Sequence, residues 1–407
     1  MARARAAGLQ VIPTGLQHGT VTVMVGGRPM EITTYRGDDA YLDGRHPESV
    51  RLGVDLEEDL ARRDFTVNAM ALPIRALDAA DWKQHLVDPF GGQVDLKACR
   101  LRAVGDPLRR FAEDGLRPLR ACRFVAQLGF EVEPATAAAI PKRLEVAGKV
   151  SVERVHQELT KLLCGPAVDK GLDLLRATGL LALWLPELSP MVGCAQNRHH
   201  AFDVWGHTLE VLRCVPAEPV FRWAALLHDS GKPSTRTLGT DGEAHFFGHE
   251  ARSLVLAEHI LLHLRASRAL LKAVQSLIRH HGMYPDHSWG DAACRRFLAR
   301  LGVDGLTLED WGRFRQADHL GKGVDSETAL QHHGQVMARL QALAEAAPAL
   351  SVKDLALDGK ALMALANRPG GPWLGQLQGH LLETVLEDPS ANAAESLRAL
   401  AEDWLKS

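Results

Sequence analysis

RRFAEDGLRPLRACRF, residues 109–124, decides how the rest of the chain is interpreted, and it follows Gly105-Asp106-Pro107. Asp106 is a good helix N-cap because its side-chain oxygen can accept from the first free backbone N–H groups, and Pro107 suits the first helical position. The sequence therefore predicts a helix that starts here. Four charged side chains recur every three residues along one slowly drifting face of this helix: Asp114, Arg117, Arg120 and Arg123.

The pair Asp114 and Arg117 has two possible interpretations. Its complementary acceptors and donors could recognise the hydrogen-bonding edge of a nucleobase. Alternatively, it is a surface ion pair that contributes a few tenths of a kcal/mol. Pro118 removes a helical hydrogen bond, so we expect the helix to kink there or to start near Glu113.

Length and composition limit the function classes. A chain of 407 residues should hold two to four domains. The net charge of −3 excludes a polycation, so nucleic-acid binding must come from a local patch such as Lys97–Arg123, with eight basic and three acidic residues. The six cysteines form no C-x-x-C pair, which favours reduced thiols in the cytosol. With no secretory pattern and no apolar run long enough for a bilayer, we expect a cytoplasmic protein with no membrane partner.

The N-terminal third is predicted to begin with a β-hairpin. Residues 21–25 and 30–35 are short β-type runs separated by the turn signal Gly26-Gly27, and Glu31 lies in the second strand. A polar loop follows at residues 37–47. In the segment after it, four side chains could hold a triphosphate, a sugar or a base, or could belong to an ordinary helix start with charged caps: Arg62, Arg63, Asp64 and Asn68.

The histidines of the middle third follow a pattern. A single buried His is more often a satisfied core residue than a ligand, but imidazoles and carboxylates occur here in the order H…HD…H…HH…D. The candidate ligands are His207, His228, Asp229, His249, His280, His281 and Asp318. Such a set suits a divalent transition metal and is compatible with two ions that activate water against a phosphoester.

Several motifs, taken together and in order, resemble the bacterial tRNA nucleotidyltransferase family, the CCA-adding enzymes that share their fold with bacterial poly(A) polymerases. These motifs are HGTVTV (18–23), EITTYR (31–36), DGRHP (43–47), LARRDFTVNAMA (60–71), VDPFGG (87–92), LRAVGDPLRRFAEDGLRPLRACRF (101–124) and VSVERVHQEL (150–159). Near the C-terminus, DGKALMAL, PGGPWLG and VLEDPSAN resemble the family's module that touches the tRNA body.

The resemblance implies roles by position. Arg62, Arg63, Asp64 and Asn68 match the segment that binds the ribose and triphosphate of the incoming nucleotide. Asp114 and Arg117 match the amino-acid template that pairs with CTP or ATP, with Arg120 and Arg123 contacting phosphate. Glu31 matches the third carboxylate of a polymerase-β-like palm. Asp43 and Arg45 match the flexible loop needed to switch from C to A addition, and Glu153 and Arg154 match a neck motif that orients the template helix.

The family holds its two catalytic Mg²⁺ ions with a D-x-D pair located upstream of the HGTVTV motif. Residues 1–30 contain no Asp and no Glu. We therefore expect a palm whose N-terminal part is missing, either because the start codon has been placed too far downstream or because the truncation is real. The 407-residue chain is expected not to add nucleotides, whereas a longer natural product would add them. The histidine pattern resembles the HD phosphohydrolase superfamily. An HD domain in this family is linked to 2′,3′-cyclic phosphodiesterase and phosphatase activity, with Ni²⁺ or Mn²⁺ as the expected metal.

The predicted fold class is α+β, with a truncated polymerase-β-like nucleotidyltransferase palm followed by an elongated, all-helical body that includes an HD domain. The predicted domains are the palm (1–95), a helical neck (96–185), the HD domain (186–330) and a tRNA-binding tail (331–407). The favoured function is template-independent addition of C and/or A from CTP and ATP during tRNA 3′-end maturation or repair.

Three alternatives stay open: an HD phosphohydrolase with an RNA-binding remnant, a poly(A) polymerase, and a non-catalytic RNA-binding protein. The expected partner is tRNA, recognised at the acceptor stem and elbow mainly by shape, and no DNA partner is expected. The oligomeric state does not follow from the sequence.

Overall fold

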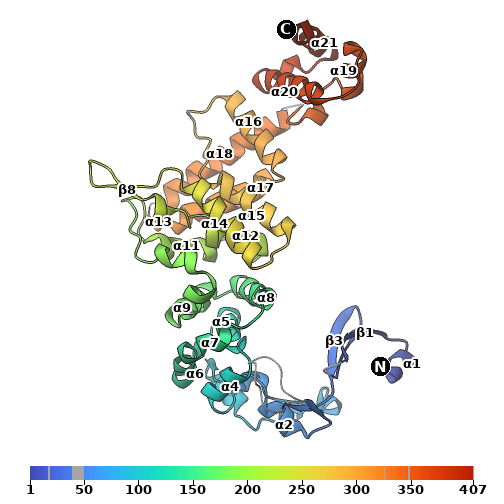
Figure 1. The fold of residues 1–407 in the computed structure, drawn as a ribbon, viewed down its shortest axis with the longest axis vertical. Coiled ribbons are helices and arrows are strands. Elements are labelled where there is room, and N and C mark those ends of the chain that lie inside the picture. The colour runs from blue at the N-terminus through green and yellow to red at the C-terminus, as the bar shows by residue number, and fades with distance from the viewer. Residues whose placement is uncertain (17–18, 39–49, 325, 347–348, 407) are drawn as a thin grey trace. The chain divides into compact units, whose positions relative to one another are not determined.

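The structure is a computed structural model that describes residues 1–16, 19–38, 50–324, 326–346 and 349–406 (Figure 1). Contacts divide the chain into two compact units, Met1–Pro186 and Glu187–Ser407. The division falls within one residue of the predicted boundary between neck and HD domain. No helix in the described ranges is both long and apolar enough to cross a membrane.

The first unit opens with α1 (Ala2–Ala6) and an antiparallel sheet of β1 (Gln10–Gly15), β2 (Thr20–Val25) and β3 (Arg28–Thr33), in the order β1-β2-β3. The predicted hairpin is confirmed: β2 pairs with β3 from Thr20↔Thr33 to Val25↔Arg28. Gly26 and Gly27 have φ of 55° and 77°, the left-handed values that a tight two-residue hairpin turn needs. Strand β1 was not predicted; it includes Pro13, which an edge strand tolerates.

Short elements follow the sheet. β4 (Arg36–Asp38) pairs with β5 (Val50–Leu52), and α2 (Leu56–Ala61) begins at Asp55, whose side chain accepts from the Glu58 backbone N at 2.8 Å. The predicted loop residues Asp43 and Arg45 lie outside the described residues. The unit then forms η2 (Thr66–Asn68), η3 (Ile74–Ala76), η4 (Trp82–His85), α3 (Gly92–Lys97) and β6 (Arg100–Leu101).

The helix predicted from Asp106 is in fact two helices, α4 (Pro107–Glu113) and α5 (Arg117–Leu128). The predicted cap is confirmed, because the Asp106 side chain accepts from the Leu108 backbone N at 3.0 Å and Pro107 begins the helix. Asp114 has extended backbone angles (φ −141°, ψ 111°) and ends α4. Pro118 lies in the first turn of α5, where a proline costs no hydrogen bond. Asp114 and Arg117 therefore do not share one helix face.

The rest of the first unit is helical and packs around α5. It contains β7 (Glu131–Val132), α6 (Pro134–Ala139), η5 (Pro141–Arg143), α7 (Leu144–Ala147), α8 (Val152–Leu163), α9 (Val168–Ala177) and α10 (Leu180–Trp184). Helix α5 packs against α8 and α9. Its apolar face is fully buried with theirs, as the solvent-inaccessible side chains of Leu119, Cys122, Leu162 and Leu172 show.

The second unit begins its helical core with α11 (Val204–Cys214), α12 (Pro219–Leu227) and α13 (Lys232–Thr235). The hairpin of β8 (Thr237–Leu238) and β9 (Ala244–His245) leads to α14 (His249–His263), α15 (Arg268–His281), α16 (Asp291–Val303), α17 (Leu308–Gly321) and α18 (Ser326–Ala346). Helix α15 packs against α12, α14 and α17, and α11 packs against α17. Helices that carry the candidate ligands therefore meet in one core.

A C-terminal group of helices has its own apolar core. It comprises η7 (Val352–Asp354), α19 (Gly359–Ala366), α20 (Pro372–Glu387), η8 (Pro389–Ala391) and α21 (Ala394–Lys406), and its buried core includes Leu362, Leu377, Leu381 and Leu397. The predicted boundary at residues 330/331 falls inside α18, which continues to Ala346. The helical tail therefore starts later than predicted, because the apolar pattern of α18 belongs to the preceding bundle.

Candidate functional site

The residues after α2 form an ordered charge cluster around Asp59. This carboxylate is 2% exposed and accepts from Arg62 Nη2 at 2.7 Å, Arg63 Nη2 at 3.0 Å and the Arg36 backbone N at 3.2 Å. Burial by itself raises the pKa of Asp59, but these hydrogen bonds outweigh it and hold the pKa below its usual value. Asp59 was not predicted from the sequence, although its spacing of three and four residues from the arginines was a usable signal.

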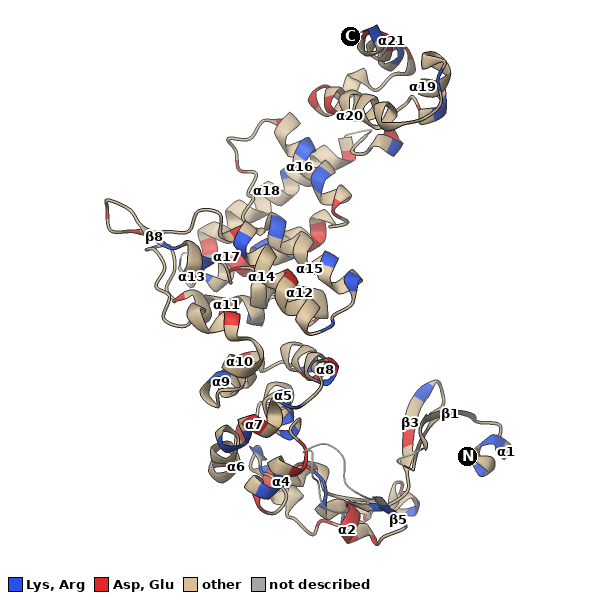
Figure 2. Cartoon of the chain, in the orientation of Figure 1, with Lys and Arg blue, Asp and Glu red and all other residues tan. Residues whose placement is uncertain are grey.

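Asp64 joins this segment to α5. Its Oδ2 accepts from Arg120 Nε at 2.7 Å and lies 2.6 Å from Arg120 Nη2, while its Oδ1 accepts from the Phe65 backbone N and from Asn68 Nδ2. The structure thus brings together three residues predicted to bind nucleotide. In Figure 2, acidic and basic segments lie close together around α4 and α5.

Arg123 is in a different environment. Its Nε lies 2.7 Å from Glu158 Oε2 of α8, and its guanidinium carbon lies 3.8 Å from the centre of the Phe124 ring. Burial lowers the pKa of Arg123, whereas the Glu158 charge raises it. Arg123 therefore forms a buried ion pair between α5 and α8, and its predicted contact with phosphate stays a prediction.

Asp114 and Arg117 do not contact each other through an ion pair or a hydrogen bond between their side chains. Asp114 Oδ2 accepts from Arg154 Nη2 of α8 at 3.2 Å, which places the predicted neck residue directly on the predicted template residue. Arg117 Nη1 donates to Glu113 Oε2 at 2.6 Å, and its Nη2 donates to the Arg62 carbonyl oxygen at 2.8 Å. The interpretation of Asp114 and Arg117 as an i,i+3 ion pair is therefore wrong, because the helix ends at Asp114 and the two side chains turn toward different partners.

The other residue of the neck motif, Glu153, precedes Arg154 in the first turn of α8. Glu31, the predicted palm carboxylate, lies on the exposed strand β3 opposite Thr22. Groups of three or more possible metal ligands occur in the described part of the chain at two places, both in the second unit. The described residues of the first unit therefore do not fit the Mg²⁺ pair that nucleotidyl transfer requires, and they support no step through it.

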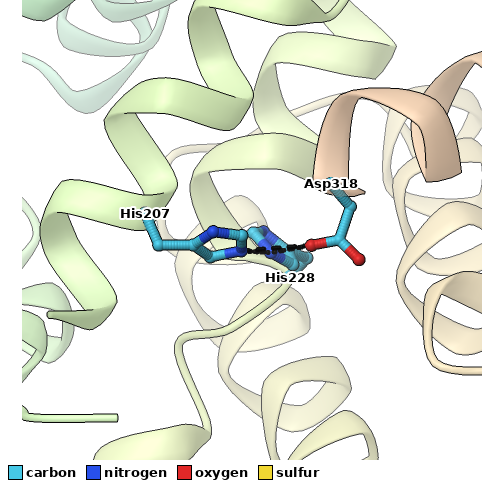
Figure 3. A group of neighbouring side chains, drawn as sticks. All are labelled: His207, His228 and Asp318. Atoms are coloured by element: carbon cyan, nitrogen blue, oxygen red, sulfur yellow. Dashed lines mark hydrogen bonds and ion pairs between the residues drawn. The ribbon is translucent and has the colours of Figure 1, made fainter. Parts of the chain in front are cut away.

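In the second unit, His207 of α11, His228 at the end of α12 and Asp318 of α17 point toward one another (Figure 3). His207 Nε2 lies 3.3 Å from His228 Nε2 and 3.1 Å from Asp318 Oδ1. All three side chains are buried. This is the first of two groups that could each hold an ion.

The second group consists of Asp229, His249 at the start of α14 and His281 at the end of α15. His249 Nε2 lies 3.4 Å from His281 Nε2 and 3.4 Å from Asp229 Oδ1. The other oxygen of the same carboxylate, Asp229 Oδ2, lies 3.2 Å from His228 Nε2 and 3.4 Å from His207 Nε2. Asp229 therefore stands between the two groups, as a carboxylate that bridges two ions would.

The hydrogen bonds behind the imidazoles fix their tautomers. In His228, His249 and His281, Nδ1 lies 2.9, 2.9 and 2.6 Å from the carbonyl oxygen of the residue three positions earlier. Because each Nδ1 donates to a carbonyl, each neutral imidazole presents the lone pair of Nε2 to the centre of the site. Lone pairs that face carboxylates at this distance repel unless a cation lies between them. The donor set therefore fits a pair of divalent transition metals.

The pKa values of the buried ligands are strongly shifted from their usual values. Burial raises the pKa of Asp229, but His228 and Lys232 hold it well below its usual value. Burial also raises the pKa of Asp318, but hydrogen bonds from His207 and His228 and the charge of Arg315 together hold it well below its usual value. Burial lowers the pKa of His228, whereas Asp229 and Asp318 raise it by more, to about 9, so without a metal its Nε2 carries a proton that a bound ion would displace. The site thus favours positive charge at the place where the ligands converge.

His280, also predicted as a ligand, points elsewhere. Its Nε2 lies 2.7 Å from Asp304 Oδ2 and its ring packs against Phe297. Consecutive residues of a helix point about 100° apart, so His280 and its neighbour His281 cannot face one centre. The prediction that both are ligands is therefore corrected to His281 alone.

Two further cations contact the ligands and were not predicted from the sequence. Lys232 Nζ lies 2.7 Å from Asp229 Oδ2, and Arg315 Nη1 donates to Asp318 Oδ2 at 2.6 Å. Each is three residues from the carboxylate that it contacts, within a turn or helix, and this spacing was the available signal. Arg315 leaves the other oxygen of Asp318 directed at the histidines.

Comparisons with known proteins cover nearly the whole chain. Residues 4–102 match the model of the poly A polymerase head domain, 129–192 that of the probable RNA and SrmB-binding site of polymerase A, and 251–401 that of the putative tRNA nucleotidyltransferase domain 2. The chain is 30% identical to the CCA-adding enzyme of Anoxybacillus flavithermus, over 96% of this chain and 83% of that enzyme. It is 34% identical to the A-adding tRNA nucleotidyltransferase of Deinococcus radiodurans, over 94% of this chain and 88% of that enzyme.

The chain belongs to the tRNA nucleotidyltransferase family. Among solved structures, it is similar to the CCA-adding enzyme of Bacillus stearothermophilus in complex with CTP, with a TM-score of 0.67 and 25% identity over 98% of this chain and 84% of that one. The predicted fold class is confirmed in its main features, a nucleotidyltransferase head and a largely helical body. As a member of the family, the protein is a nucleotidyltransferase, and the family implies a divalent metal.

Proposed function

We propose that this nucleotidyltransferase selects CTP and/or ATP for addition to the 3′ end of tRNA, with Asp114 as the residue that recognises the base. The observation that carries the proposal is the link between two distant segments. Arg120 binds the carboxylate of Asp64, and Arg117 binds the carbonyl of Arg62. These contacts hold the start of α5 against the segment predicted to bind ribose and triphosphate.

The chemistry of Asp114 fits C and A better than U and G. Cytosine and adenine each present an exocyclic amino group beside a ring nitrogen that accepts, whereas uracil and guanine present a carbonyl beside an N–H. A carboxylate accepts and an arginine donates, so together they complement the first pattern. Asp114 is partly exposed and its partner Arg154 is 30% exposed, so a base can reach this pair.

Nucleotide binding by the full chain tests the proposal. Isothermal titration in the presence of Mg²⁺ should show tighter binding of CTP or ATP than of UTP and GTP, and Asp114→Ala should remove the difference. A matched control is Asp173→Ala, which changes a 54% exposed carboxylate on α9. Equal affinities for all four nucleotides in the unchanged protein would contradict the assignment.

The supported partner is tRNA, because the relatives of this chain include an A-adding tRNA nucleotidyltransferase that is 34% identical to it. We expect the RNA backbone to be held by charge, so tRNA affinity should fall as salt rises.

A second function is favoured by the bridging position of Asp229. We infer that the second unit hydrolyses phosphoesters, such as the 2′,3′-cyclic phosphate of an RNA 3′ end. His207, His228 and Asp318 would hold one ion and His249 and His281 the other, with Asp229 shared. A metal pair of this kind supplies an activated water and a charge clamp for the phosphoryl oxygens. Water adds to phosphorus, one P–O bond of the ring breaks, and a phosphate monoester with a free hydroxyl results.

This second function predicts that the protein binds metal ions in a fixed ratio to the chain. Full-length protein incubated with Mn²⁺ or Ni²⁺ and then desalted should retain two ions per chain by mass spectrometry, and Asp229→Ala should retain fewer. The same variant should lose hydrolysis of a 2′,3′-cyclic nucleotide. Hydrolysis that persists in Asp229→Ala would exclude the assigned ligands.

A further inference from the structure

The β8–β9 hairpin presents an exposed aromatic surface next to the metal ligands. Phe247, two residues after the end of β9, is 81% exposed. Its ring lies parallel to that of His245, at an interplanar angle of 8° and a centroid distance of 5.5 Å. Along the segment, Ala244 is buried, whereas His245 is partly exposed and Phe247 is mostly exposed. His245 is stacked against one face of the Phe247 ring, so the two rings form a short aromatic stack, and the hairpin lies beside α13 in Figure 1.

A tight turn fixes this surface to the metal site. The His249 backbone N donates to the Phe246 carbonyl oxygen at 3.2 Å, so Phe247 and Gly248 are the two central residues of the turn. Gly248 has φ of 75°, which the third position of such a turn requires. The same Phe246 carbonyl lies 2.9 Å from His249 Nδ1. Phe247 is thereby held two residues from a ligand whose own orientation is fixed.

The metal ligands are most accessible at His249. Its side chain is 16% exposed, whereas the other five ligands are between 0% and 8% exposed. A phosphoester that approaches the two groups therefore does so from the side of His249. The aromatic surface stands at that side, because Phe247 and His249 belong to one turn.

We propose that the His245–Phe247 surface stacks the terminal base of an RNA whose 3′-phosphoester reaches the metal site. This inference rests on the phosphoester hydrolysis proposed for the second unit, and it assigns the substrate class as RNA 3′ ends, as opposed to small phosphoesters without a base. Stacking on an aromatic face is tolerant of sequence, since every base has a π face. The surface would therefore accept any terminal nucleotide.

Binding of a short RNA that ends in 2-aminopurine with a 2′,3′-cyclic phosphate tests the proposal. Full-length protein in EDTA, which prevents hydrolysis, should quench the 2-aminopurine fluorescence. Phe247→Ala should abolish the quenching and raise Kd by about fivefold or more, the change that corresponds to about 1 kcal/mol of stacking. Phe247→Trp should retain both effects. Val303→Ala, which alters a 77% exposed side chain on α16, serves as the matched control.

An RNA with an abasic 3′-terminal residue separates stacking from other contacts. It should bind the unchanged protein and Phe247→Ala with equal affinity. If Phe247→Ala binds the 2-aminopurine RNA as tightly as the unchanged protein, the proposal is overturned. If quenching depends on Phe247 but the metal-loaded protein does not open the cyclic phosphate, the hydrolytic function fails and the stacking surface stands.

Discussion

The buried ion pair between Arg123 and Glu158 separates a structural role from the nucleotide-binding role that the sequence suggested. The two side chains are 10% and 6% exposed and approach to 2.7 Å. Arg123→Met removes the closer partner of a buried carboxylate and leaves it with the more distant Lys161, at 3.4 Å. Loss of one partner of a buried pair typically costs about 3–5 kcal/mol. Arg123→Met with Glu158→Leu replaces both partners by apolar groups of similar size. This double variant should recover most of the loss.

Hydrogen exchange of the full chain measures this effect locally, which suits a protein of two compact units. Amides of α5 and α8 should lose roughly a hundredfold or more of their protection in Arg123→Met, because about 1.4 kcal/mol corresponds to a factor of ten. The double variant should regain protection and still bind CTP or ATP. Two results would refute the reasoning: unchanged protection in the single variant, or a well-protected double variant that no longer binds nucleotide.

Three further predictions concern the other sites. Arg154→Ala should keep the fold but weaken the preference for CTP or ATP over UTP and GTP, as measured by isothermal titration, because Asp114 loses the donor that orients it. Mn²⁺ or Ni²⁺ should raise the melting temperature of the second unit, as measured by calorimetry, and EDTA should reverse the rise. At a hundredfold excess of metal over Kd, the added free energy of unfolding is about 2.7 kcal/mol. Burial alone raises the pKa of Asp95, but hydrogen bonds from Thr66, Arg100 and Arg102 hold it below 3.8. The contribution of Asp95 to stability is therefore present above about pH 4 and is lost as the pH falls further. In an acid titration followed by circular dichroism, Asp95→Asn should lose less stability over this range than the unchanged protein.

Features that local chemistry decides could be predicted from the sequence. The Asp106 cap and the Gly26-Gly27 turn depend on groups within three residues, so their patterns carry the full information. The order of histidines and carboxylates likewise identified six residues that the structure gathers into two groups. The family resemblance rested on contiguous motifs, and the relatives that are 30% and 34% identical to this chain bear it out.

Features in which distant segments compete for one side chain could not be predicted in this way. Asp114 could have paired with Arg117 on a continuous helix, but the contact with Arg154 lies 40 positions away in the sequence. The ion-pair partner of Arg123, Glu158, likewise lies on a different helix, α8. Of the two neighbours His280 and His281, only packing of α15 decides which one faces the metal ligands. These choices depend on tertiary contacts, which no local spacing encodes.

The same tertiary contacts explain why the proposed base-selecting residue and the proposed phosphate-binding segment act as one unit. Arg117 joins α5 to the Arg62 carbonyl while Glu113 holds its other nitrogen, and its predicted role in pairing with the base stays a prediction. A lysine has the charge but not the planar fork that reaches both partners, so the two residue types are not interchangeable at this position. If the proposed roles of these segments hold, an arginine at position 117 also fixes the distance between the segment that recognises the base and the segment that binds the phosphates.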